Sequence, residues 1–314
     1  MLDIVGKRKW FFLLSALIII PGLIAMGITW ARYGTPVRLS IDFTSGSLLE
    51  AQFQKAVPPE QVRAVALAQG VQDPQVQSAG SDGKTVIIRS KPLDTAAKVA
   101  FEAALSKQFG PLQEQRFDTV GPAVGDEVTR AAVTAVVIAS VAILLFIAFS
   151  FRRVPNALRF GVCATAATVH DILVALGFFA IMGLLFGWEA DSLFLTALLT
   201  MIGFSVQDTI VVFDRIRENV PKHRGEPYEL IVNRSLTETL HRSLAVELTA
   251  VFVLTAILFF GGATMKQFAA VLLVGMLSGS YSSICNAVPL LVVWQNGEIG
   301  QFFRSLRRQP AAQA

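Results

Sequence analysis

The stretch SVQDTIVVFDRIREN, residues 205–219, places a carboxylate inside a segment that has the character of a membrane span. Residues 192–206 carry no charge, but as a helix they rise only about 22 Å, short of the roughly 30 Å of bilayer hydrocarbon. Continued through Phe213, the helix rises about 33 Å, which is enough to span. Asp208 then lies inside the membrane, where an ionisable residue is by default a functional candidate.

The rest of the chain has the composition of a multi-span membrane protein. Of its 314 residues, 53% are hydrophobic and 16% are charged, and the apolar residues gather in long runs. The uncharged runs predict six spans, at residues 10–31, 131–151, 160–188, 192–213, 243–265 and 267–295. His170 and Asp171 interrupt the third span, and Glu247 interrupts the fifth.

The first span begins as a signal peptide would, with three basic residues at 7–9. The apolar run that follows is too long for a signal-peptide core, and WARYG at 30–34 is a poor small-residue cleavage site. We therefore expect an uncleaved membrane anchor.

Positive charge divides unevenly between the two sides that six spans define. The short segments on the side of the termini carry fifteen basic residues: Lys7, Arg8, Lys9, Arg152, Arg153, Arg159, Arg215, Arg217, Lys222, Arg224, Arg234, Arg242, Arg304, Arg307 and Arg308. The two short loops on the other side carry Lys266 alone. This bias predicts that both termini are cytoplasmic. The net charge of +4 reflects this topology, and no basic patch with stacking aromatics points to nucleic acid.

Between the first two spans lies a segment of about a hundred residues that reads as a small α/β domain outside the cytoplasm. Residues 37–53 suggest strand, glycine-containing turn and strand, and 58–70 suggest a helix. Residues 73–90 suggest a hairpin around Ser81-Asp82-Gly83. A helix at 94–110, between Asp94 and Gly110, and a strand at 112–120 complete a ferredoxin-like β-α-β-β-α-β order. With no nucleotide loop or catalytic constellation there, we expect a contact or mechanical module.

The predicted organisation therefore has four parts: residues 1–31 with the first helix, the outer domain at 32–129, five further helices at 130–296, and a cytoplasmic tail at 297–314. The two cysteines, Cys163 and Cys285, fall in predicted spans. Neither a disulfide framework nor zinc-ligand spacing is present, and we expect no cofactor or metal.

Four further residues near the predicted spans are candidates to act with Asp208 and its neighbours Gln207 and Thr209. The third span could begin at Ile172, leaving His170 and Asp171 at its edge, or near Phe160, placing Asp171 mid-membrane. Glu247 must lie inside, because dropping it leaves too short a span. Arg242 either extends to the cytoplasmic surface or folds inward as the countercharge of Asp208. The glycines and serines of 272–289 favour close helix packing, and a polar lining is the less favoured role.

Seven stretches, in this order, resemble the SecF branch of the bacterial SecD–SecF protein-export family, within the resistance-nodulation-division superfamily. They are GKRKWFF (6–12), IDFTSGS (41–47), VGPAVGDE (120–127), HDILVALGFFA (170–180), FSVQDTIVVFDRIREN (204–219), NRSLTETLHRS (233–243) and SGSYSSICNAVP (278–289). Together they extend over nearly the whole chain, and FDRIREN after an intramembrane aspartate is the most specific of them.

The resemblance implies a non-enzymatic auxiliary subunit of the bacterial inner membrane, paired with SecD. It implies that the proton-motive force drives secretory preproteins through the SecYEG channel after the ATPase SecA has acted. The family's key aspartate falls on Asp208 and its arginine on Arg242, which favours an inward Arg242. Gln207 stands where relatives commonly have Asn. Glu247, in LAVELTA at 244–250, stands where they have a Ser/Thr-rich run, so the family assigns it no role.

Two other functions compete with protein export. An intramembrane aspartyl protease would use Asp171 and Asp208 as a dyad, but neither residue has the sequence context of such a site. A proton-driven small-molecule exporter of the same superfamily would usually contain two six-helix halves, and this chain has one. The sequence leaves open whether protons or sodium ions drive the cycle.

The predicted topology can be tested with an impermeant thiol reagent on intact cells. A cysteine introduced at Ser81 should react, because the outer domain faces the medium side of the membrane, whereas one at Arg224 should not. The reverse pattern would contradict the charge argument.

Overall fold

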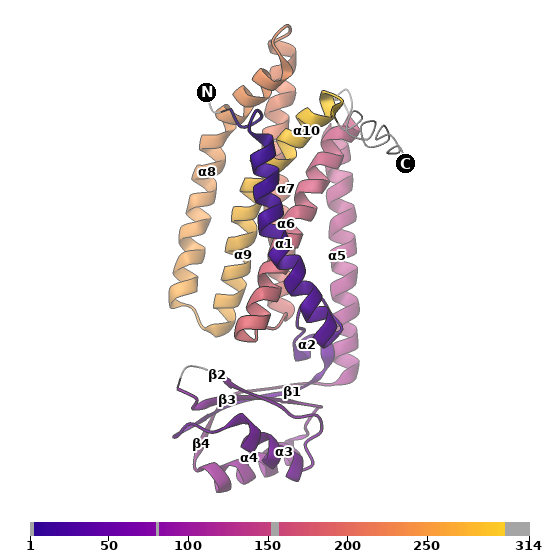
Figure 1. Ribbon diagram of the computed structural model, residues 1–314. Coiled ribbons are helices and arrows are strands. Elements are labelled where there is room, and N and C mark those ends of the chain that lie inside the picture. Colours follow the sequence, from indigo (N-terminus) through magenta and orange to yellow (C-terminus); the bar gives the residue numbers. More distant parts are fainter. Residues whose placement is uncertain (1–2, 80–81, 152–156, 299–314) are drawn as a thin grey trace, which may run out of the picture. The chain divides into compact units, whose positions relative to one another are not determined.

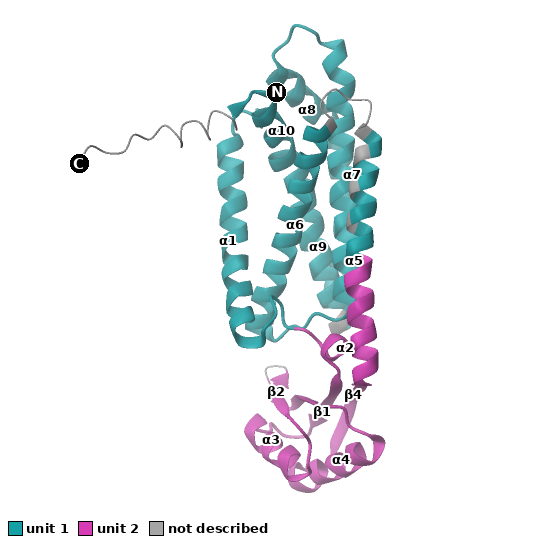
Figure 2. Ribbon diagram, turned by 90° about the vertical axis from the view of Figure 1, so that its right-hand side faces the viewer, with its two compact units in different colours: residues 1–38, 136–314 teal, residues 39–135 magenta. Residues whose placement is uncertain are grey.

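The computed structural model describes residues 3–79, 82–151 and 157–298. It divides into two compact units, one formed by Met1–Arg38 with Val136–Ala314 and the other by Leu39–Ala135 (Figure 2). The first is a bundle of helices and the second is a small α/β unit.

The six predicted membrane-crossing helices are confirmed within the described ranges (Figure 1). Five are continuous and the last is broken: α1 (Arg8–Tyr33), α5 (Pro122–Phe151), α6 (Ala157–Phe186), α7 (Ser192–Lys222), α8 (Tyr228–Phe260), and α9 (Ala263–Ser282) with the π-helical turn η1 (Ser283–Ala287) and α10 (Val288–Gln295). Because α6 begins at Ala157, the alternative start at Ile172 is wrong, and Asp171 lies in the middle of the helix.

Helices α7 and α8 extend well past the predicted boundaries at Phe213 and Ser243. A charge ends an apolar run but does not interrupt helical hydrogen bonding, so the helices continue as a polar hairpin. Arg215 and Glu238 join the two extensions, with Nε and Oε2 2.6 Å apart. The side chain of Asn219 on α7 donates to Ser235 Oγ on α8 at 3.0 Å.

The two ends of the helical unit lie at the same end of the bundle. Arg8, at the start of α1, forms a salt bridge of 2.7 Å with Glu298, which follows α10. An even number of crossings requires this arrangement.

Close helix packing depends on glycines at two contacts. Gly22 of α1 and Gly177 of α6 meet backbone to backbone, since a Cβ on either would come within 2.7 Å of the other's Cα. Gly279 of α9 lies against Ser205 of α7, where a Cβ would come within 3.1 Å of the serine Cβ. These contacts are the expected use of small residues in membrane helices. Helix α9 packs against α6, α7 and α8.

The outer unit has the predicted β-α-β-β-α-β order. Its elements are β1 (Gly46–Phe53), α3 (Pro59–Ala68), β2 (Gln75–Ala79), β3 (Thr85–Ser90), α4 (Thr95–Phe109) and β4 (Leu112–Val120). The strands form one antiparallel sheet in the order β2-β3-β1-β4, as in ferredoxin-like folds, and the two helices lie on one face of it (Figure 1). Ser81, in the predicted hairpin turn, lies outside the described residues.

Local signals explain why these elements form where they do. Asp94 caps α4 by accepting a hydrogen bond of 2.7 Å from the Ala97 N–H, and Gly110 ends that helix with a φ of 89°. Along β1, alternate residues turn inward, so Leu49 and Phe53 pack with Phe101 of α4 in the core.

The first of the two strands predicted in residues 37–53 is wrong. Residues Ile41–Thr44 instead form a short helix, α2, because the Ser40 hydroxyl accepts a hydrogen bond from the Asp42 N–H at 3.2 Å and so caps it. The preceding residues belong to the helical unit, since Arg38 forms a buried salt bridge of 2.6 Å with Glu189. In the structure the outer unit begins at Leu39.

Ser45, between α2 and β1, holds a backbone conformation that normally requires glycine, with φ 59° and ψ 164°. We expect Ser45→Gly to raise the free energy of unfolding of the outer unit by roughly 1 kcal/mol, because relief of strain exceeds the added entropy of glycine. Chemical denaturation measures this. Ser47→Gly is the matched control and should lower the stability of the outer unit, because it removes hydrogen bonds to Thr119 and Leu93. An equal loss of stability in the two variants would show that the Ser45 backbone is not strained.

The outer unit should fold by itself without a disulfide or a metal. Expressed alone, residues 39–121 should give one cooperative melt that neither chelator nor reductant changes. Phe101→Ala should lower its stability by roughly 3–5 kcal/mol, because the side chain is fully buried. A disordered wild-type fragment would show instead that the unit folds only against other parts of its assembly.

Candidate functional site

Asp171, at the middle of α6, is fully buried and held by three serine hydroxyls. Its Oδ2 accepts hydrogen bonds from Ser205 Oγ of α7 at 2.5 Å and from Ser282 Oγ of α9 at 2.7 Å. Its Oδ1 accepts from Ser278 Oγ of α9 at 2.6 Å. A buried carboxylate requires such donors, and these come from two neighbouring helices. We call this arrangement the Asp171 cage.

His170 belongs to the same cluster. Its Nδ1 lies 3.0 Å from Asp171 Oδ1, and the side chain is buried. Its other ring nitrogen, Nε2, has no hydrogen-bond partner among the described residues. The ring lies beside Tyr281, with centroids 6.1 Å apart. The predicted pair thus lies within the bundle and not at its edge.

The order of residues in α9 divides its hydroxyls between two faces. Ser278 and Ser282 are four residues apart, so they lie on one face, toward Asp171. Ser280 lies about 200° around the helix from Ser278 and therefore points elsewhere. Because Gly279 has no side chain, α9 can approach α7 closely enough for these short hydroxyls to reach.

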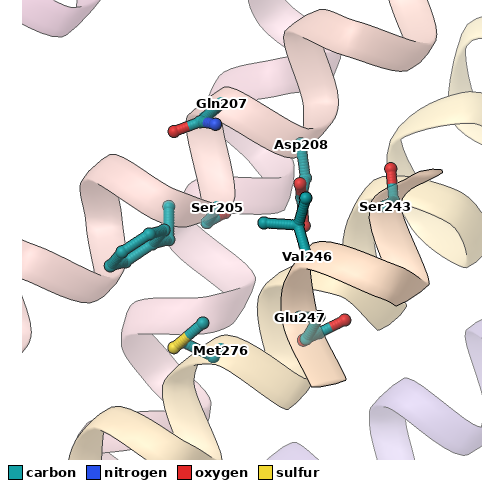
Figure 3. Close-up of a pocket in the computed structure, with 8 residues that line it drawn as sticks. Ser205, Gln207, Asp208, Ser243, Val246, Glu247 and Met276 are labelled. Atoms are coloured by element: carbon teal, nitrogen blue, oxygen red, sulfur yellow. The ribbon is translucent and has the colours of Figure 1, made fainter. Parts of the chain in front are cut away.

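Asp208 lies half-buried on α7. Its Oδ2 accepts a hydrogen bond of 2.9 Å from Ser280 Oγ, the α9 serine that does not face Asp171. Figure 3 shows it pointing toward the turn of α8 that carries Ser243 and Val246. Between α7, α8 and α9 there is a small cleft of about 20 Å³, enough to hold a water molecule. Its lining is Phe204, Ser205, Gln207, Asp208, Ser243, Val246, Glu247 and Met276.

Glu247 of α8 is the second carboxyl of this cleft, here called the Asp208 cleft. The residue is 8% exposed, and its Oε1 is buried with no hydrogen-bond partner among the described residues. Glu247 and Asp208 line the same cleft, and Ser280 donates its hydrogen bond to Asp208.

The structure separates the remaining candidates. Gln207 is exposed and lines the Asp208 cleft, whereas Thr209 is buried on another face of α7, where it shares a hydrogen bond of 3.0 Å with Ser283. Arg242 is exposed on α8, does not line the cleft, and forms no salt bridge with any described residue. The inward Arg242 that the resemblance favoured is thus not formed within the single chain.

The serine partners are the functional residues that sequence analysis missed. The glycine- and serine-rich stretch at 272–289 was assigned to packing, yet Ser278, Ser280 and Ser282 all bind carboxylates. The signal was the i, i+4 spacing of hydroxyls in a helix that must pack near an intramembrane acid.

The geometry does not support an aspartyl dyad. Both Asp171 oxygens already accept serine hydroxyls, and no hydrogen bond joins Asp171 to Asp208 among the described residues. The two aspartates of a protease dyad lie side by side and share one catalytic water, and the serine-bonded oxygens of Asp171 are not available for that.

Comparison with protein families identifies both parts of the chain. A model described as protein export membrane protein SecD/SecF, C-terminal, matches residues 100–297, and one described as SecD/SecF GG motif matches residues 33–57. In the second range the chain has no two adjacent glycines; Gly46 follows Ser45, which adopts the glycine-like conformation described above.

Close relatives match along their full length. Protein translocase subunits SecF of Anaerolinea thermophila and Thermobaculum terrenum are each 46% identical, over 97% and 100% of both chains respectively. The crystal structure of SecDF, a translocon-associated membrane protein from Thermus thermophilus, is 30% identical, with a TM-score of 0.78. That match includes 94% of this chain and 39% of the Thermus chain. The curated relatives are transport proteins and not enzymes, and the chain belongs to the SecF family of protein translocase subunits.

Proposed function

We propose that the chain works with a SecD partner to use the proton-motive force to complete protein export through SecYEG. The partner is supported by the Thermus SecDF structure, of which this chain matches a minor part. The observation that best supports this function is the position of Asp208, a carboxyl inside a membrane-crossing helix, beside a cleft large enough for water. Secretory preproteins and membrane lipid are the other partners of this function.

Asp208 is the proton-carrying group in this proposal. An aspartate at the centre of a membrane helix costs roughly 2.5–3.5 kcal/mol, so a merely structural position would favour a neutral residue. Ser280 is its one hydrogen-bond donor among the described residues, which leaves room for a proton to bind and leave. When Asp208 gains or loses that proton, its hydrogen bonds and ion pairs to neighbouring helices change. Proton passage is thereby coupled to movement of those helices.

The exposed polar groups beside Asp208 indicate where SecD lies. Gln207 and Arg242 are exposed on α7 and α8, and a polar surface at this depth is unfavourable against lipid tails. We place the partner's helices over this surface. In that complex Arg242 can turn inward and act as the countercharge of Asp208, which offsets the cost of burying both.

Asp171 and His170 have a different role. The Asp171 cage satisfies the carboxylate fully, so we assign the pair to holding α6 against α7 and α9 while Asp208 changes its proton. Thr209, bonded to Ser283, supports the same helix contact.

The orientation follows from charge. We place both termini in the cytoplasm of a bacterium and the outer unit on the far side of its inner membrane, because basic residues gather at the end that carries Arg8 and Arg215. The small-molecule exporter alternative has no observation in its favour, since the relatives that match the whole length are translocase subunits.

Asp208→Asn keeps the size and polarity of the side chain but cannot titrate. We expect loss of the proton-driven late stage of export, measured as the rate of secretory precursor maturation, while the complex with SecD still assembles. Asp214→Asn is the matched control, because it makes the same change on the same helix at an exposed salt bridge with Arg217. A fully active Asp208→Asn would refute the proposal.

Replacing both Asp208 and Arg242 with neutral residues separates proton carriage from simple charge pairing. If the two only neutralise each other, the double variant regains activity, because no unpaired buried charge remains. We expect it to stay inactive although assembled, because nothing is left to titrate.

A further inference from the structure

We propose that Glu247 is the second proton-carrying group of this chain: Glu247 and Asp208 form a carboxyl pair that holds one proton between them, with Ser280 as the shared hydroxyl. The inference rests on the proposed function and deepens it. No family pattern assigns Glu247 a role.

The first support is geometric. Glu247 lines the same cleft as Asp208, is 8% exposed, and keeps Oε1 buried with no partner among the described residues. A buried carboxyl oxygen without a donor is costly unless it carries a proton or faces one. Ser280 donates to Asp208, and we place its hydroxyl between the two acids that line the cleft.

The second support is charge. The titratable groups of the surrounding helices that flank the two acids include His241 and Arg242 of α8, Asp214 of α7, Asp171 and His170 of α6, and Lys266 and Tyr281 of α9. His241 and Arg242 are exposed, Asp214 pairs with Arg217, and Asp171 lies within its own cage. No described cation pairs with either acid of the cleft. Even with Arg242 turned inward in the complex, one of two carboxylates would lack a countercharge, which is unfavourable in the membrane. One shared proton reduces the charge of the pair to −1.

The two acids of the pair lie at different distances from the outer ends of their helices. Asp208 lies about 24 Å along α7 from the end that begins at Ser192, and Glu247 lies about 20 Å from the end of α8 at Phe260. These are the outer ends in the proposed topology, so Glu247 is nearer the outer surface. A proton entering from outside would bind Glu247 first.

The transfer step is balanced. The O–H bond of protonated Glu247 breaks as its proton passes to Ser280 Oγ, and the Ser280 hydroxyl proton passes to Asp208 Oδ2. Glu247 ends as the carboxylate and Asp208 as the acid, and the serine is unchanged. The charge of the pair is the same before and after, so the step needs no other group.

The test uses the full chain in complex with SecD, in membrane vesicles. Dicyclohexylcarbodiimide reacts with protonated carboxyls in apolar surroundings, and peptide mass spectrometry locates the label. We expect label on Asp208 or on Glu247 but not on both in one chain, since one proton serves the pair. Chains labelled at both sites would overturn the proposal. Sodium ions that block labelling at constant pH would show a metal cation in the proton's place and would also overturn it.

The second arm measures the pH profile of proton-driven export in variants. Glu247→Gln should lower the rate roughly tenfold or more and displace the profile along the pH axis, and Glu247→Asp should recover part of both. Glu229→Gln, the same change in the first turn of α8, where the partly exposed carboxylate pairs with Arg8, should change neither. A wild-type rate, or a slower rate with an unchanged profile, would assign Glu247 a structural role at most. Asp208→Asn distinguishes the two proposals. If Asp208→Asn is inactive while Glu247→Gln exports normally, the proposed function stands and the carboxyl pair is rejected.

Discussion

The bundle is organised around one buried charge. Asp171 has no exposed surface, and an uncompensated carboxylate in the membrane interior would be unfavourable by several kcal/mol. It is compensated by hydroxyls that two other helices must bring within 2.5–2.7 Å. This requirement fixes the rotation of α9, its contact with α7 at Gly279, and the depth of α6. The apolar contacts of the bundle hold the helices together but do not determine the rotation of α9 or the position of α6.

The same helix serves two acids with different consequences. On one face α9 donates two hydroxyls to Asp171, which receives a third from α7, and on another its Ser280 donates to Asp208. A fully bonded carboxylate stays in one state, whereas a partly bonded one can exchange its proton. The contrast is the basis for the different roles that we propose for the two aspartates. It also explains why motion at the Asp208 cleft need not disturb the Asp171 cage.

The sequence was informative where a pattern follows from one element and its surroundings. Run lengths predicted the six crossings and the mid-membrane position of Asp208, and turn and cap residues such as Asp94 predicted the order of the outer unit. The serine donors could not be predicted, because the face on which Ser278 and Ser280 lie depends on how α9 is rotated against its neighbours. The end of α7 was placed too early and the start of α8 too late, since helices extend beyond their apolar runs. The direction of the Arg242 side chain could not be predicted, because a guanidinium near the end of an apolar run can turn outward to water or inward to a countercharge.

The Asp171 cage also bears on how such a protein can change over evolutionary time. Its three donors are independent single residues, and replacing any serine by alanine removes one hydrogen bond and little volume. Bonds to a charged group contribute roughly 1.5–3 kcal/mol each, so the cage can be weakened in discrete, survivable steps. Lineages at different external acidity therefore have a graded route for adjusting the bundle without touching the carboxylate.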